Sequence, residues 1–147
     1  MKKLITLFQP FIVIGRKAVC FISRPKRFGS HVVIVFKNEV LLVTTTYWPG
    51  YGLPAGGIKK GETPYDAAIR EVQEEVGIHL ETITSLGSFV VREDNVTDTV
   101  YVFYAQVLTK EYTLDRFEIN SALWVPLEEL PKLNTGAAVA IERYKNR

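Results

Sequence analysis

Residues 56–78 read GGIKKGETPYDAAIREVQEEVGI, and the interpretation of the whole chain starts from this stretch. Thr63 followed by Pro64 predicts the start of a helix, because a hydroxyl side chain caps the first turn and proline fits the first helical position. Gly77 predicts its end, since glycine adopts the left-handed conformation of a C-cap at little cost. The sequence therefore predicts a helix of about thirteen residues that follows a glycine-rich loop.

At 100° per residue, the predicted helix has an apolar stripe and, on nearly the opposite side, an acidic sector. The stripe consists of Tyr65, Ile69, Val72 and Val76. The acidic sector consists of Glu71, Glu74 and Glu75, with Ala67 beside them. Like charges one turn apart destabilise a helix, so we expect cations at this sector. Hard oxygen ligands select Mg²⁺ or Mn²⁺, and the small side chain of Ala67 leaves room for a phosphate.

A solvated surface is the simpler interpretation of three glutamates on one helix. Two neighbouring features argue for a site instead. The loop at residues 54–57, Pro-Ala-Gly-Gly, lets backbone pass close to a ligand. Arg70 lies one turn before Glu74 and can bond its carboxylate or orient a neighbouring one.

Composition indicates one compact domain. The chain has 147 residues, of which 47% are hydrophobic, enough for one sizeable core. The net charge of +2 gives no reason to expect a nucleic-acid partner. The single cysteine, Cys20, excludes an internal disulfide and favours a cytoplasmic location. Of the two histidines, His31 and His79, we expect structural roles, so a histidine-built metal site is not predicted.

Residues 1–28 differ from the rest, because residues 4–14 are mostly apolar and basic residues flank them. Eleven residues are too few to span a bilayer. Three interpretations stay open: a cover for the core or for a homodimer seam, an interfacial membrane anchor, and an export signal. We favour the first, in which residues 1–28 pack on the domain or at an interface and residues 29–147 form the domain.

Within residues 29–147, β-branched runs and turn signals predict alternating strands and helices. The predicted elements are strands 31–36, 40–46, 83–92, 99–108 and 123–126, a glycine- and proline-rich loop 47–61, an acidic loop 93–98, a helical turn 127–130 and a terminal helix 135–144. Strands with helices on both sides and mixed pairing predict an α/β (α+β) fold, a three-layer α/β/α sandwich with a mixed sheet.

The stretch at residues 56–78 resembles the signature box of the Nudix hydrolases, a family that cleaves nucleoside diphosphates linked to another group. The positions that the family's pattern specifies are Gly56, Glu62, Arg70, Glu71, Val72, Glu74, Glu75, Gly77 and Ile78. Because each residue type is used at only a few per cent, a chance match is roughly below one in a million. From residue 29 to the C-terminus, the order of elements also resembles the Nudix fold.

The resemblance implies attack of water on a phosphorus of a diphosphate bridge, with Mg²⁺ or Mn²⁺ bound. The implied metal ligands are Glu71 and Glu75, Glu74 shared or holding a second ion, and the backbone carbonyl of Ala55. Arg70 is expected to position the glutamates, and Glu62 to pin the loop to the helix or to touch a metal-bound water. The general base comes either from the box or from a later loop. The loop candidates are Glu118, with Glu93, Asp94 and Asp98 in reserve.

We expect the substrate to contact the backbone of Gly56 and Gly57 and the ring of Tyr51, since aromatic rings stack on bases. Tyr47, Trp48, Phe89, Tyr101 and Phe103 are further stacking candidates. The predicted function is a metal-dependent pyrophosphohydrolase of a nucleotide sugar or an ADP-ribose type of molecule. The predicted partner is a small-molecule nucleotide. The alternatives are hydrolysis of nucleoside triphosphates and a catalytically silent nucleotide-binding module.

Overall fold

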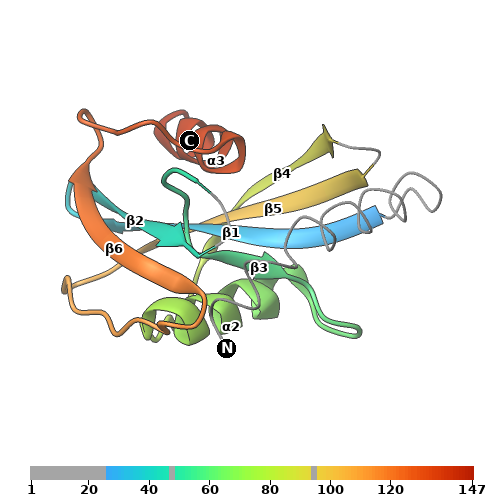
Figure 1. Ribbon diagram of the computed structural model, residues 1–147, viewed down its shortest axis with the longest axis horizontal. Coiled ribbons are helices and arrows are strands. Elements are labelled where there is room, and N and C mark those ends of the chain that lie inside the picture. Colours follow the sequence, from blue (N-terminus) through green and yellow to red (C-terminus); the bar gives the residue numbers. More distant parts are fainter. Residues whose placement is uncertain (1–25, 47–48, 94–95) are drawn as a thin grey trace, which may run out of the picture.

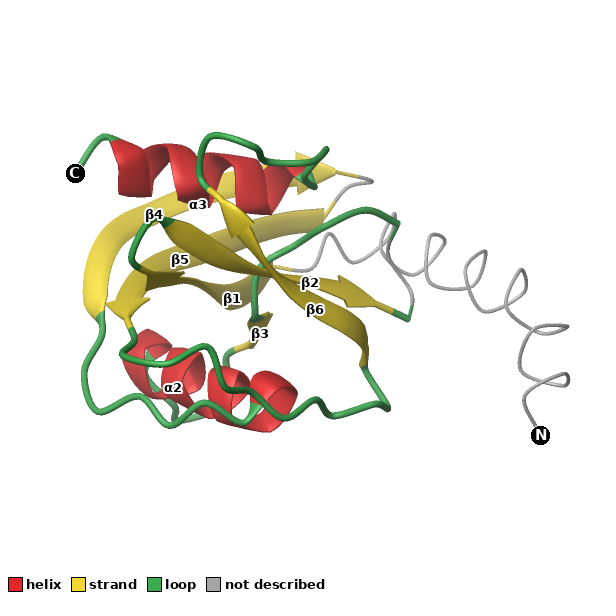
Figure 2. Cartoon of the chain, turned by 90° about the vertical axis from the view of Figure 1, so that its left-hand side faces the viewer, coloured by secondary structure: helices red, strands yellow, loops and turns green. Residues whose placement is uncertain are grey.

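Figures 1 and 2 show a mixed sheet with one helix on each face, in a computed structural model that describes residues 26–46, 49–93 and 96–147. The strands are β1 (Lys26–Phe36), β2 (Glu39–Thr45), β3 (Ala55–Gly57), β4 (Thr84–Glu93), β5 (Val96–Gln106) and β6 (Ile119–Pro126). The helices in the described part are α2 (Pro64–Val76) and α3 (Thr135–Lys145). The three-layer α/β/α sandwich expected from the sequence is confirmed.

The central strand of the sheet is β1. The strand order is β4-β5-β1-β2-β6, and β3 pairs with β1 outside this order. Along one edge β1 runs parallel to β5 for ten residue pairs, from Lys26 opposite Thr97 onward. Along its other edge, residues 29–31 of β1 pair with β3 and residues 35–36 pair with β2. The short strand that leads into the box is thus fixed against the middle of the sheet.

Both faces of β1 are buried because successive side chains alternate between two halves of the core. Val33 and Val35 pack in the half that contains residues of α3. Val32 and Ile34 pack in the half that contains residues of α2. A near-continuous β-branched run is what a strand covered on both faces requires.

The ends of α2 lie where the sequence predicts them. The Oγ1 of Thr63 accepts a hydrogen bond from the N–H of Asp66 at 3.1 Å, and Pro64 is the first helical residue. Gly77 ends the helix with a φ of 65°, in the left-handed region. The terminal helix α3 is capped in the same way, since Asn134 Oδ1 accepts from the N–H of Ala137 at 2.8 Å.

Other boundaries differ from the expected ones because backbone pairing with neighbouring strands extends several strands. β1 begins at Lys26, and part of the expected loop 47–61 forms β3. Residues 96–98, expected in an acidic loop, open β5 and pair with β4. The expected helical turn at residues 127–130 is a simple turn, in which the N–H of Glu129 donates to the carbonyl of Pro126 at 2.9 Å.

The buried side of α2 is wider than the apolar stripe predicted. The buried residues of α2 are Ala67, Ala68, Val72, Glu75 and Val76. Tyr65 is instead 37% exposed, and its hydroxyl accepts from the N–H of Ile83 at 3.3 Å. α2 packs on β1 and also contacts β3, so part of its acidic sector is covered. Ala67 is fully buried, so the expected room for a phosphate beside it is absent.

The predicted N-terminal segment and three other residues lie wholly or mostly outside the described residues. The segment 1–28 lies outside the described residues except for its last three, which belong to β1. Tyr47, Trp48 and Asp94 also lie outside them. No helix in the described ranges is both long enough and apolar enough to cross a membrane.

Candidate active site

Arg70 bonds three carboxylates and one backbone carbonyl. Its Nε and Nη2 donate to the two oxygens of Glu62, at 2.7 and 2.9 Å. Its Nη1 donates to Glu71 Oε1 at 2.7 Å and to Glu74 Oε2 at 2.9 Å. Its Nη2 also donates to the carbonyl oxygen of Gly57 at 3.0 Å. The guanidinium therefore ties the glycine loop, Glu62 and the acidic sector of α2 into one network, which is the planar fork geometry that suits arginine.

Glu62 connects the loop to the helix, which is one of the two roles that the resemblance implies for it. Besides its two bonds from Arg70, its Oε2 accepts from the backbone N–H of Lys59 at 2.9 Å. These donors, Arg70 first, lower the pKa of Glu62 to about 2. Glu62 is thus a carboxylate throughout the neutral range, and the same bonds raise the pKa of the Arg70 guanidinium.

Glu71 lies directly against β3 because residue 56 has no side chain. A Cβ placed on Gly56 would overlap the carboxylate of Glu71. A Cβ placed on Gly57 would meet nothing within 4 Å. The two glycines of the box therefore have different surroundings: Gly56 is required for the close approach of α2 to β3, and Gly57 faces open space.

Among the Asp, Glu, Lys and Arg residues in the described part of the chain, only Glu75 is buried, with 5% of its surface exposed. Its Oε2 accepts a hydrogen bond from the N–H of Ala55 at 3.0 Å. Burial raises the pKa of Glu75 to about 8 despite that bond. The neighbouring carboxylates Glu71, Glu118 and Glu74 act in the same direction. Without a cation, Glu75 therefore keeps a proton in the folded protein near neutral pH.

This pKa predicts how the stability of the metal-free protein depends on pH. Unfolded Glu75 titrates near 4.5 and folded Glu75 near 8. The stabilisation from the retained proton is complete below about pH 4.5 and is lost as pH rises through about 8. In EDTA, the free energy of unfolding of the wild type should fall relative to Glu75→Gln by about 1.4 kcal/mol per pH unit at most. Denaturant titrations at pH 5, 6.5 and 8 measure this difference, and parallel profiles for the two proteins would contradict it.

Ala55 presents backbone groups toward Glu75. Its N–H bonds Glu75 instead of β1, and in a strand the N–H and C=O of one residue point to the same side. The carbonyl of Ala55 therefore faces the same edge of β3 as the N–H that Glu75 binds. This is the position in which that carbonyl could act together with the Glu75 carboxylate.

The loop candidates for a general base separate clearly in space. Glu118 immediately precedes β6 and lies near enough to Glu75 to raise the pKa of Glu75. The carbonyl of Glu118 also accepts from the N–H of Thr46 at 3.1 Å, which anchors the loop to the end of β2. Asp98 lies in β5, where alternation with Val100 places it on the α3 face of the sheet. Glu93 is the last residue of β4.

Tyr51 lies apart from the glutamates. It packs against the half of the core that contains α3, and it pairs with Leu133 in an isolated bridge. Of the other stacking candidates within the described ranges, Phe89 packs in that same half. Tyr101 and Phe103 pack in the half of the core that contains residues of α2. The structure thus brings Ala55, Gly56, Gly57, Glu62, Arg70, Glu71, Glu74, Glu75 and Glu118 together, and leaves Tyr51 on the opposite face.

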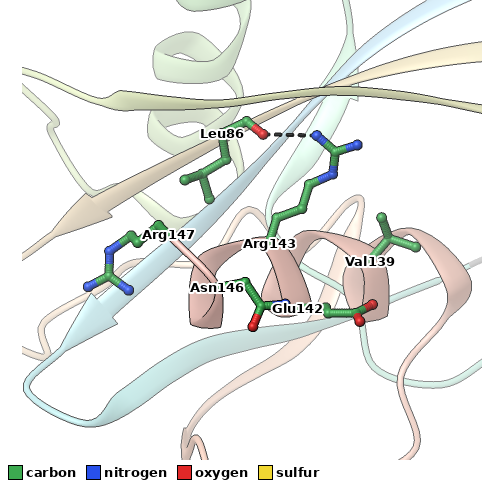
Figure 3. A pocket seen from close by; sticks show the side chains of 6 residues that line it. All are labelled: Leu86, Val139, Glu142, Arg143, Asn146 and Arg147. Carbon is green, nitrogen blue, oxygen red and sulfur yellow. Dashed lines mark hydrogen bonds between the residues drawn. The ribbon is translucent and has the colours of Figure 1, made fainter.

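A shallow hollow of about 460 Å³ lies between α3 and β4, away from the box (Figure 3). It is lined by Leu86, Val139, Glu142, Arg143, Asn146 and Arg147. Arg143 is engaged there, because its Nη1 donates to the carbonyl of Leu86 at 2.9 Å. The carboxylates that Arg70 connects lie on the opposite side of the sheet, so we place the candidate site at the box.

The donor chemistry of the box fits a hard divalent cation, since it offers carboxylates and a backbone carbonyl. Within the described ranges, no three His, Cys, Asp or Glu side chains already converge as a ligand set. The bonds account for this: Arg70 holds Glu71 and Glu74, and Glu75 is turned to Ala55. A cation would compete with Arg70 for the first two and with a proton for the third.

Comparisons with known proteins point to one family. Residues 25–144 match the profile of the NUDIX domain. The chain is 38% identical over 85 residues to the putative mutator protein MutT4 of Mycobacterium tuberculosis, covering 55% of this chain and 34% of that protein. It is 34% identical over 84 residues to the ADP-ribose pyrophosphatase of Bacillus subtilis, covering 55% and 45%. The chain thus spans less than half the length of these two relatives.

A solved structure supports the same assignment. The crystal structure of a MutT NUDIX hydrolase from Burkholderia pseudomallei superposes with a TM-score of 0.75 at 26% identity, over 81% of this chain and 98% of that one. The family profile covers most of the chain, and the pattern of the box is complete. The chain belongs to the NUDIX family.

Proposed function

We propose that the chain is a metal-dependent pyrophosphohydrolase. Water would attack a phosphorus of the diphosphate bridge in a nucleoside diphosphate linked to another group, such as a sugar or a ribose phosphate. The observation that carries the proposal is the buried Glu75 beside Glu71 and Glu74, next to a glycine loop with open space at Gly57. Three carboxylates bonded to one arginine leave an excess of negative charge that a cation would neutralise.

The proposed metal ligands are Glu71, Glu75 and the carbonyl of Ala55, with Glu74 shared or holding a second ion. Bound Mg²⁺ or Mn²⁺ would screen the diphosphate charge and lower the pKa of the attacking water. The chain's own contribution is positional. Gly56 allows Glu71 to approach β3, and Gly57 leaves space at the loop through which phosphate oxygens can approach.

Arg70 and Glu62 are proposed to hold the metal ligands in place. Arg70 contacts Glu71 and Glu74 directly, and Glu62 fixes the other side of the guanidinium. When a cation takes Glu71 and Glu74, Arg70 still has Glu62 and the Gly57 carbonyl as partners. The guanidinium is therefore held in place in both states.

Nucleoside triphosphates are the alternative substrate class. Similarity to an ADP-ribose pyrophosphatase favours the linked diphosphates. A silent nucleotide-binding module has less support, because no glutamate of the box is missing.

A substrate panel tests the proposal. The purified full chain is incubated with ADP-ribose, UDP-sugars, dinucleoside polyphosphates and nucleoside triphosphates, each with Mg²⁺, with Mn²⁺ and with EDTA. We expect nucleoside monophosphate from a linked diphosphate in the metal reactions alone. Pyrophosphate released from triphosphates at the higher kcat/KM would favour the alternative. Nucleotide binding without turnover in any reaction would indicate a silent module.

Glu118 is proposed as the loop-borne general base, and its role can be separated from metal binding. Glu118→Gln should lower kcat at saturating Mg²⁺ by about a hundredfold and leave Mn²⁺ affinity within twofold, because a base acts on the water and not on the cation. A loop-borne metal ligand would instead lose affinity and rate together. Glu111→Gln, an exposed change in the same loop, is the control. An unchanged rate with unchanged affinity would remove Glu118 from the site.

A further inference from the structure

Two polar residues are classed as buried in the described part of the chain, and both lie beside β3. One is Glu75, and the other is Ser30 of β1, which is fully buried. The Oγ of Ser30 finds no hydrogen-bond partner among the described residues. Because buried hydroxyls are nearly always bonded, this orphan requires an explanation. Nothing in the sequence singles out Ser30, because one serine at the start of a β-branched run belongs to no motif.

The ladder places Ser30 directly opposite Gly56. Residues opposite each other in an antiparallel pair point to the same face, with Cβ atoms about 5 Å apart. A Cβ on Gly56 would overlap the Glu71 carboxylate, so the side chain of Ser30 lies beside that carboxylate. Alternation along β1 agrees, because Val32 packs in the half of the core that contains α2.

We propose that Ser30 is a positioning residue for the metal ligand Glu71. When a divalent cation draws Glu71 from Arg70, the Ser30 hydroxyl donates a hydrogen bond to the Glu71 carboxylate, directly or through one water. The bond replaces the one that Arg70 Nη1 makes to Glu71 Oε1 at 2.7 Å. The inference rests on the proposed function, because it requires that the box binds metal.

Removal of the hydroxyl should weaken metal binding without lowering stability. Ser30→Ala should weaken Mn²⁺ binding about tenfold, the usual loss when a hydrogen bond to a metal ligand is removed. The thermal midpoint in EDTA should stay the same or rise, because the variant removes a buried donor without a partner. A structural role would lower the midpoint.

Ser88→Ala is the matched control. Tyr101 of β5 pairs with Ser30 on one side and with Ser88 on the other, so the two serines point to the same face of the sheet. Unlike Ser30, Ser88 is exposed. Calorimetric or spin-resonance titration of Mn²⁺ into the metal-free full chain compares the three proteins. We expect wild type and Ser88→Ala to bind equally and Ser30→Ala about tenfold more weakly.

Two results would overturn the inference, and they are distinguishable from failure of the proposed function. Equal Mn²⁺ affinity of Ser30→Ala and wild type removes Ser30 from the site and leaves the proposed function intact. A Ser30→Ala protein with both a lower midpoint and weaker binding indicates a structural role. A wild type that binds no Mn²⁺ overturns the proposed function, and the role of Ser30 with it.

Discussion

Glu75→Gln is expected to lower turnover by at least a hundredfold, a barrier increase of about 2.7 kcal/mol. The amide keeps the size of the side chain and can still accept the N–H of Ala55, so the local structure should survive. What is lost is the negative charge at a buried position where a cation would be held. Hydrolysis rates at increasing Mg²⁺, alongside a Mn²⁺ titration, measure the two losses, and we expect rate and affinity to fall together.

Glu81→Gln is the control for this change, because Glu81 is exposed and lies just past the C-cap of α2. It removes the same charge from the chain without touching the box, and we expect wild-type rates. Full activity of the Glu75→Gln protein would exclude Glu75 as a metal ligand. If high Mg²⁺ restored the activity of the Glu75→Gln protein, Glu75 would contribute to metal affinity and not to the chemical step.

Gly56→Ala should have the second-largest effect. The added methyl group would overlap the carboxylate of Glu71, so either Glu71 or β3 must move. A displacement of about 1 Å at reacting groups can cost a hundredfold in rate, and we expect a loss of that order. Weaker Mn²⁺ binding should accompany it, since the displaced group is a proposed ligand. Steady-state kinetics and metal titration of the variant test both.

Gly57→Ala is the matched control one residue further along. Its methyl group would meet nothing within 4 Å, and neither glycine has a φ in the left-handed region, so backbone strain does not distinguish them. We expect Gly57→Ala to keep the metal affinity of the wild type. A KM increase would be consistent with substrate passing at Gly57. Equal loss of metal affinity in both variants would contradict the role of Gly56.

The sequence predicted the box helix well because the signals are local. Thr63, Pro64 and Gly77 determine its ends through their own backbone and side chains, and these rules hold in any fold. The positions of the longer strands along the chain followed from β-branched runs for the same reason. The network of Arg70 with Glu62, Glu71 and Glu74 was partly foreseeable from spacing along the helix.

The burial of Glu75 could not be predicted from the helix, because it depends on β3, which is held by pairing with β1. The angular positions of residues around a helix predict one buried side and one solvent-facing side. α2 is instead covered by two strands, β1 and β3. The proximity of Ser30 to Gly56 could not be predicted, because it depends on the register in which β1 pairs with β3. Tyr51 was expected to contact the substrate, and Asp98 was a reserve candidate for the general base. Packing and strand alternation place both on the α3 side of the sheet.

The parallel pairing of β1 with β5 has a consequence for how the protein reaches its native state. The paired residues lie about seventy positions apart, and the whole box lies inside the loop that their contact closes. Closing so long a loop costs conformational entropy before the contacts between β1 and β5 can stabilise the chain. This step is therefore slow compared with formation of α2. Metal-binding competence should therefore appear late in refolding, after helical signal has returned, and a refolding time course followed by both signals would separate the two events.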